Sequence, residues 1–189
     1  MYLNHNQILQ LIQNGEMHGV NLDNVNAASL DVCLGNEIYV EEFRQTSIPV
    51  DYRRRERLNM RRVELPDTGY AIRPGEFFLA HTVEKCNFAD DTAALFRIKS
   101  SMGRIGLEHM DAGWVDPGFN GKLTLEFKNM TSYHNILLRP GDKIGQLIFF
   151  KGEPVNAEQS YRTRGNYNGA EGVMQVRYKE DGNDDCERI

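Results

Sequence analysis

Residues 116–127 read DPGFNGKLTLEF, a turn sequence followed by an alternating run. Asp-Pro-Gly is typical of a tight turn, because proline presets the backbone and glycine accepts a positive φ. In the run that follows, Leu123, Leu125 and Phe127 alternate with polar residues. Successive side chains of a β-strand point to opposite faces, so we predict a strand over residues 122–127 with one face in the core.

Similar short runs follow Ser29, each apolar or alternating, with turn residues between them. The turn sequences are LGN at 34–36, PDTG at 66–69, RPG at 73–75, DPG at 116–118 and RPG at 139–141. Short strands separated by turns are typical of an all-β sandwich or barrel. One helix is predicted before them: Asn4 or Asn6 can cap it, apolar residues recur at helical spacing up to Ile12, and Asn14-Gly15 ends it.

The chain has 189 residues, 40% of them hydrophobic and 26% charged, which predicts one globular domain over residues 1–189. The acidic tail at residues 180–189 is expected to fray. The formal net charge of -5 does not attract polyanions, so we expect no nucleic-acid polymer as a partner. A small phosphorylated ligand remains possible, because it needs only a local cluster of cations and N–H groups.

The cysteines predict a reducing environment. Cys33, Cys86 and Cys186 are widely spaced and form no Cys-x-x-Cys pair, so neither a disulfide framework nor a zinc knuckle is indicated. The N-terminal residues lack a basic region before an apolar one, and no eighteen consecutive residues are apolar, so we expect no secretory signal and no membrane span. A cytoplasmic location fits these features.

Three polar groups are candidates for binding or chemistry. The first holds two cations, two hydroxyls and a glycine within six residues, the groups that bind a phosphate chain, although a helix cap or turn also uses them. Its members are Lys99, Ser100, Ser101, Gly103 and Arg104. The second is the pair Asp116 and Glu126, for which a turn carboxylate and a solvent-facing strand carboxylate are the alternatives.

The third group is a basic segment at residues 52–62. Its cations are Arg53, Arg54, Arg55, Arg57, Arg61 and Arg62. We interpret this segment as a solvated loop or edge, with a phosphate or nucleic-acid patch as the alternative.

Several motifs occur together in a specific order. They are SLDVCLGN at 29–36, KSSMGR at 99–104, AGWVDPGFNG at 112–121, TLE at 124–126 and PGDKIGQL at 140–147. Over roughly Ala27 to Arg177 this order resembles the dCTP deaminases, relatives of the trimeric dUTPases. The resemblance implies a mostly β fold, a distorted dUTPase-like barrel that forms a homotrimer, with active sites where the subunits meet.

The resemblance also implies a reaction, the removal of the 4-amino group of a deoxycytidine nucleotide by water. Glu126 falls on the catalytic glutamate of that family, and one carboxylate can shuttle the protons that this hydrolysis requires. The zinc-dependent route uses His-x-Glu and Cys-x-x-Cys motifs, and neither occurs here, so we expect no zinc and no protein metal site. A triphosphate would bring Mg²⁺ bound mainly through phosphate oxygens and waters.

The resemblance assigns roles to individual residues. The implied catalytic residues are Glu126, Ser100, Arg104 and Asp116. The implied nucleotide-binding residues are Lys99, Ser100, Ser101, Met102, Gly103, Arg104, Asp116, Thr124, Leu125, Glu126, Gln146, Tyr161, Asn166 and Ala170. Asp116 would contact the deoxyribose 3′-hydroxyl, Gln146 the phosphate chain, and Tyr161 the nucleotide under a C-terminal lid at about residues 160–175.

Gly113-Trp114 resembles the pair found in bifunctional members, which also hydrolyse dUTP to dUMP and diphosphate. A core aromatic is the alternative interpretation of Trp114. The sequence departs from the family at Asp111, where threonine is usual, and at Asn166 and Ala170, where lysine and glutamine are usual. Losing a cation and an amide from the lid would weaken triphosphate binding.

The alternatives to a bifunctional dCTP deaminase therefore stay open. They are a deaminase with that activity alone, a dCMP-preferring deaminase, a dUTPase that retains Glu126, and a trimer that binds nucleotides without turning them over.

Overall fold

The computed structural model describes residues 1–43, 49–51 and 56–177. Arg53, Arg54, Arg55 and the acidic tail lie outside the described residues. The strands are β1 (Met17–His18), β2 (Leu30–Glu41), β3 (Met60–Glu64), β4 (Tyr70–Ile72), β5 (Phe77–Asn87), β6 (Thr92–Ile98), β7 (Leu107–His109), β8 (Trp114–Val115), β9 (Asn120–Asn129), β10 (Ile136–Leu138) and β11 (Lys143–Lys151). The helices are α1 (His5–Gln13), the short 3-10 helix η1 (Leu22–Asn24), α2 (Ser100–Arg104) and α3 (Tyr161–Arg164).

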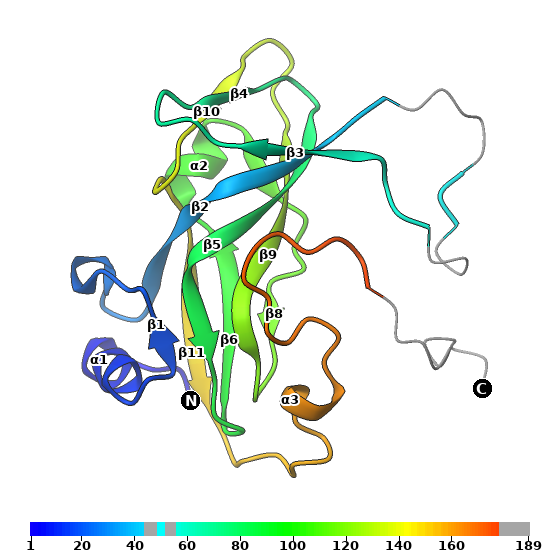
Figure 1. The fold of residues 1–189 in the computed structure, drawn as a ribbon. Coiled ribbons are helices and arrows are strands. Elements are labelled where there is room, and N and C mark those ends of the chain that lie inside the picture. Colours follow the sequence, from blue (N-terminus) through cyan, green and yellow to red (C-terminus); the bar gives the residue numbers. More distant parts are fainter. Residues whose placement is uncertain (44–48, 52–55, 178–189) are drawn as a thin grey trace.

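Nine of the strands form one curled antiparallel sheet. Its hydrogen-bonded order is β7-β9-β5-β2-β11-β6-β8, with β1 added to β5 and β3 added to β2. β4 and β10 form a separate two-stranded ribbon at one end of the molecule (Figure 1). The predicted mostly β fold is confirmed, although no ladder joins β7 to β8 in the described chain, so the barrel is incompletely closed.

The core fills the inside of the curl, and β9 shows how the alternation produces it. Leu123, Leu125 and Phe127 are buried, whereas Thr124 and Glu126 on the other face are half-buried. The ring of Phe127 stacks on that of Phe78 of β5, with centroids 5.4 Å apart. The predicted core face of this strand is therefore confirmed.

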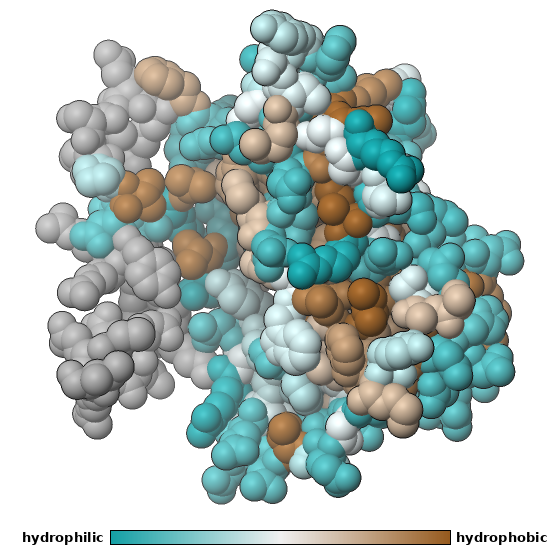
Figure 2. Space-filling model, turned by 180° about the vertical axis from the view of Figure 1, so that it is seen from behind, coloured by the Kyte–Doolittle hydropathy of each residue, from teal (hydrophilic) through white to brown (hydrophobic). Residues whose placement is uncertain are grey.

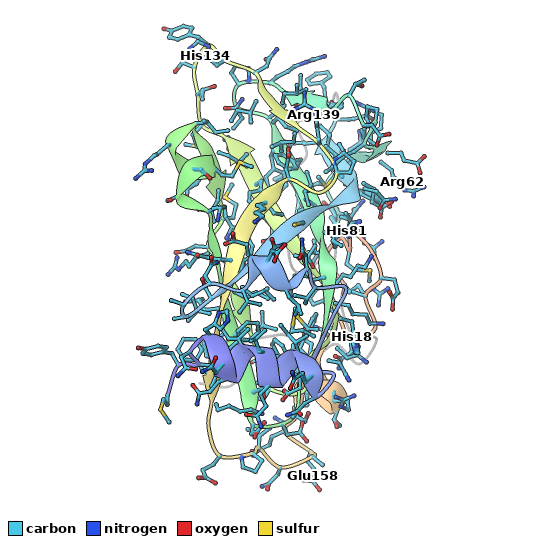
Figure 3. The ribbon with its side chains drawn as sticks, turned by 90° about the vertical axis from the view of Figure 1, so that its left-hand side faces the viewer. His18, Arg62, His81, His134, Arg139 and Glu158 are labelled. Atoms are coloured by element: carbon cyan, nitrogen blue, oxygen red, sulfur yellow. The ribbon has the colours of Figure 1, made fainter. Side chains whose placement is uncertain are left out.

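The predicted N-terminal helix is also confirmed, with Asn4 as its cap. The Asn4 side chain accepts the backbone N–H of Gln7, and the Gln7 side chain accepts that of Asn4, which forms a capping box. Ile8 and Leu11 are buried, and Figure 3 shows the helix lying across the strands at one end of the sheet. In the residues described, no helix is both long and apolar enough to span a membrane.

β2 and β5 approach each other closely where their ladders change register. The β2–β5 ladder shifts after Leu34, and the β5–β9 ladder shifts after His81. His81, on β5, is buried. A Cβ atom at Gly35 would lie 2.1 Å from the His81 ring, so a larger residue would clash at this position of β2.

We predict that Gly35→Ala lowers the free energy of unfolding by about 1–3 kcal/mol, because the added methyl group overpacks the buried ring. Urea denaturation followed by circular dichroism measures the change. Gly152→Ala is the matched control, since a Cβ atom there meets nothing within 4 Å. Its effect should stay within about 0.5 kcal/mol. Equal losses in the two variants would contradict the steric explanation.

Candidate active site

A cavity of about 530 Å³ opens beside β9. Its walls come from the half-buried face of β9, from residues 112–116 around β8, and from the segment after α3. Leu58 and Met60, at the end of the basic segment, complete the rim. A cavity of this volume is typical of small-molecule sites.

Glu126 lines this cavity from β9. Its side chain is 31% exposed, so it is not an ordinary solvent-facing strand residue. The Oε2 atom is buried and has no hydrogen-bond partner in the described structure. Burial raises the pKa of the Glu126 carboxyl. A carboxyl held closer to neutrality in a cavity is suited to proton exchange with a ligand.

His109, on β7, faces Glu126. Its Nε2 atom lies 3.7 Å from Glu126 Oε2 and is likewise buried without a hydrogen-bond partner among the described residues. The imidazole packs edge-on against Phe96 and Phe127, with ring centroids 4.7 and 5.5 Å away. Burial lowers the pKa of His109 to about 4, so the ring is neutral near pH 7. His109 was not predicted from the sequence, because a single histidine on a three-residue strand produces no spacing pattern.

Trp114 and Asp116 form another part of the wall. The indole Nε1 of Trp114 donates a hydrogen bond of 2.9 Å to Asp116 Oδ1. Trp114 is 56% exposed, so it is not a core aromatic. A Cβ atom at Gly113 would lie 2.4 Å from the carbonyl oxygen of Phe96, which explains the glycine before the tryptophan.

The C-terminal segment covers the cavity by adding to the edge of β9 (Figure 1). The backbone N–H of Lys122 donates to Ala170 O at 2.7 Å, and that of Met174 donates to Thr124 Oγ1 at 2.9 Å. Tyr161 also lines the cavity. A lid at about residues 160–175 stays a prediction. Met174, which lines the cavity too, was not predicted from the sequence.

The residues predicted to bind phosphate do not line this cavity. Ser100 to Arg104 form α2, and neither this helix nor Gln146 lines the cavity that holds Glu126. Ser100, Ser101, Gly103 and Arg104 are exposed, whereas Met102 packs against the core. Arg104 lines a second, separate hollow together with His134, which Figure 3 shows on the loop at one end of the molecule.

Lys99 and Gln146 do come together, around a buried carboxylate that sequence analysis missed. Asp31 is 4% exposed and lies opposite Gln146 in the β2–β11 ladder. The Lys99 ammonium lies 2.6 Å from Asp31 Oδ2, and that of Lys143 lies 3.8 Å from the same atom. The hydroxyl of Ser29 donates to Gln146 Oε1 at 3.2 Å. A second polar cluster therefore lies beside α2.

The departures from the family pattern have defined positions. Asp111 pairs with Arg97 and does not line the cavity. Ala170 is buried against β9, where its carbonyl accepts the bond described above. Asn166 is outside the cavity lining, and its Oδ1 atom is buried without a hydrogen-bond partner among the described residues.

The fold and sequence have clear relatives. Residues 2–152 match the model of a family described as dCTP deaminase-like. The chain is 38% identical over 182 residues to a "dCTP deaminase, dUMP-forming" of Persephonella marina, covering 94% of this chain and 97% of that protein. It is 36% identical to the protein of the same name from a Sulfurihydrogenibium species, covering 94% and 97%.

The structure superposes on the crystal structure of a 2′-deoxycytidine 5′-triphosphate deaminase from Agrobacterium tumefaciens with a TM-score of 0.64. That match has 23% sequence identity and covers 80% of this chain and 48% of that chain, so it bears on the fold alone. The family match includes β9, and each of the two relatives is aligned over 94% of this chain. The chain therefore belongs to the dCTP deaminase-like family.

Proposed function

We propose that the protein deaminates dCTP to dUTP and then hydrolyses dUTP to dUMP and diphosphate. The observation that carries this proposal is Glu126, a half-buried carboxylate in a cavity of about 530 Å³, on the strand that the family match includes. The names of the two full-length relatives, "dCTP deaminase, dUMP-forming", support the same substrate and the same final product.

Glu126 would act as the proton shuttle of the first step. Ionised Glu126 takes a proton from water as the water oxygen adds to C4 of cytosine, and it passes that proton to N3. The new C4 hydroxyl then gives its proton, again through Glu126, to the amino group. The C4–N bond breaks, ammonia leaves, and a carbonyl remains at C4. Water is the only other reactant, so the step needs no oxidant or reductant.

Asp116 is the proposed group for the second step. It lines the same cavity as Glu126, and Trp114 holds one of its carboxylate oxygens. The other oxygen is then available to orient a water molecule toward the α-phosphorus of dUTP. The water oxygen forms the new bond to phosphorus, and the water gives a proton to Asp116. The bond from the α-phosphorus to the bridging oxygen breaks, and diphosphate leaves. Gly113 and Trp114 would support this step by positioning Asp116.

A homotrimer with shared active sites is part of the proposal. One chain holds Glu126 and Asp116 in one cavity, but its α2 residues and Gln146 lie outside that cavity. Among the described residues that line the cavity, Lys122 is the sole Lys or Arg, so we expect a triphosphate beside Glu126 to take further cations from another subunit. Apolar side chains such as Ile105, Met130 and Leu137 are exposed, and Figure 2 shows apolar groups on the face opposite that of Figure 1. Contacts between subunits would cover such groups.

We further propose that Mg²⁺ binds through the nucleotide phosphates. Within the described residues, no three His, Cys, Asp or Glu side chains come close enough together to hold a metal ion. Asp31, the buried carboxylate of the second polar cluster, already contacts Lys99 and Lys143. Mg²⁺ would be held by phosphate oxygens and waters, and it would neutralise part of the phosphate charge.

A cytoplasmic location belongs to the same proposal. Cys33 and Cys86 are free thiols, and burial raises the pKa of Cys33 to about 11. Unpaired cysteines fit a reducing compartment.

We predict that Glu126→Gln abolishes ammonia release from dCTP while changing nucleotide affinity little, because the amide keeps the shape but transfers no proton. The expected loss in kcat is at least about 10²-fold. Wild-type and variant protein are incubated with dCTP or dCMP and Mg²⁺, and ammonia, dUTP and dUMP are separated and measured. Ammonia release from dCMP alone would overturn the triphosphate assignment, and wild-type turnover in the variant would overturn the role of Glu126.

We predict that kcat/KM for ammonia release decreases at acidic pH, and that the midpoint of this decrease lies above the ordinary pKa of glutamate. The burial of Glu126 raises its pKa, and only the ionised form accepts a proton, so activity is present above this pKa and is lost as pH decreases through it. Initial rates measured from about pH 4 to pH 8 test this, against the ordinary glutamate pKa of about 4.3. The affinity of the Glu126→Gln variant for dCTP, measured over the same pH range, identifies any change that protonation of the substrate phosphates causes.

We predict that two inactive variants restore activity when they assemble together. Glu126→Gln and Arg104→Ala are co-expressed with different tags, and the mixed trimers are purified through both tags. If each site takes Glu126 from one subunit and Arg104 from its neighbour, every trimer that contains both variants keeps one intact site, about a third of its sites. Each variant expressed alone is the control. Mixed trimers without activity would show that a single chain supplies both residues.

A further inference from the structure

A buried oxygen of Glu126, which lines the cavity, and a buried nitrogen of His109 face each other without another partner among the described residues. Glu126 Oε2 and His109 Nε2 are both buried, neither has a hydrogen-bond partner among the described residues, and the distance between them is 3.7 Å. A buried donor or acceptor without a partner costs about 1–3 kcal/mol, and more when it is charged. One hydrogen bond between these two atoms would satisfy both. The required approach is less than about 1 Å, since an N–H···O bond is close to 2.9 Å.

The surroundings of His109 favour a neutral ring in a defined place. Phe96 and Phe127 pack against its edges, and β7 is held to β9 by a ladder in which the Met110 N–H donates to Glu126 O at 2.9 Å. Burial lowers the pKa of His109 to about 4, so the imidazole is uncharged near pH 7. It can still donate one N–H, as neutral imidazole does.

We propose that His109 is a positioning residue for Glu126, whose Oε2 accepts the Nε2–H of the neutral imidazole while Oε1 exchanges protons with water and the pyrimidine ring. This inference rests on the proposed deaminase function and adds a residue to it. His109 transfers no proton in this scheme; it keeps its own proton and fixes the rotation of the carboxylate. The hydrogen bond also favours the ionised carboxylate, which is the form that accepts the proton of water.

Other charged groups near the pair are accounted for. Asp111 and Arg97 act on His109 with opposite signs and form an ion pair with each other. Asp116 and Lys122 line the cavity on the Glu126 side. None of these four is changed in the variants below, so their effects on a pH profile stay constant.

Three substitutions separate the hydrogen bond from the packing. His109→Phe keeps a ring between Phe96 and Phe127 but removes the N–H. His109→Gln places an amide near the position of Nε2, and His109→Asn, the matched control, places its amide near the position of Nδ1. All three are purified as full-length protein, and their thermal unfolding is compared with that of the wild type. Ammonia release from dCTP is then measured across pH.

We expect His109→Phe and His109→Asn to lower kcat by about 10- to 100-fold, the loss expected for a hydrogen bond to a charged group. KM should change by no more than about threefold. The decrease of kcat/KM at acidic pH, called the acid limb, should move to higher pH, because the carboxylate loses a hydrogen-bond donor. His109→Gln should recover most of the rate and the wild-type pH profile. A purely structural role would not produce this difference between Gln and Asn.

Two results would overturn the proposal. The first is a kcat and an acid limb in His109→Phe equal to those of the wild type. The second is an equal loss in all three variants without movement of the acid limb, which would assign His109 to packing alone. Failure of the proposed function is distinguishable from both, because wild-type protein would then release no ammonia from dCTP.

Discussion

One face of β9 packs in the core and the other lines the cavity, and the candidate site depends on this difference between the two faces. Leu123, Leu125 and Phe127 fill the core, whereas Thr124 and Glu126 alternate with them on the face that lines the cavity. The period of two holds Glu126 at a defined depth, because its neighbours in the chain are fixed in the core. A shift of one residue in register would exchange the two faces and remove the carboxylate from the cavity.

The partial burial of Glu126 produces the properties that a proton shuttle needs. Exposure to water would leave its pKa in the ordinary range, and full burial without a partner would keep it neutral. The cavity gives an intermediate state, with one carboxylate oxygen buried opposite His109 and the side chain about one third exposed. The C-terminal segment contributes by hydrogen bonding to the same face of the strand and by covering it.

The separation of the two polar groups within one chain has a physical basis. Glu126 lies in an apolar cavity suited to an uncharged pyrimidine, whereas Lys99 and Gln146 lie in a charged cluster around Asp31. A triphosphate near Glu126 would disfavour its ionised form, because like charges raise the pKa of a carboxyl. In the proposed trimer, cations from a neighbouring subunit would neutralise the phosphates, while the cavity beside Glu126 keeps a mostly apolar lining.

The sequence alone predicted the mostly β fold, the capped N-terminal helix, the two faces of β9 and the family, because these follow from local periodicity and from motifs that are contiguous in the chain. It also predicted a C-terminal segment over the site, although the bond from Met174 to Thr124 could not be anticipated. Tertiary structure alone decided the proximity of His109 to Glu126, the hydrogen bond from Trp114 to Asp116, and the place of Asp31 beside Lys99. Two of these join residues far apart in the chain, and all depend on side-chain directions and on burial, which spacing in a single sequence does not record.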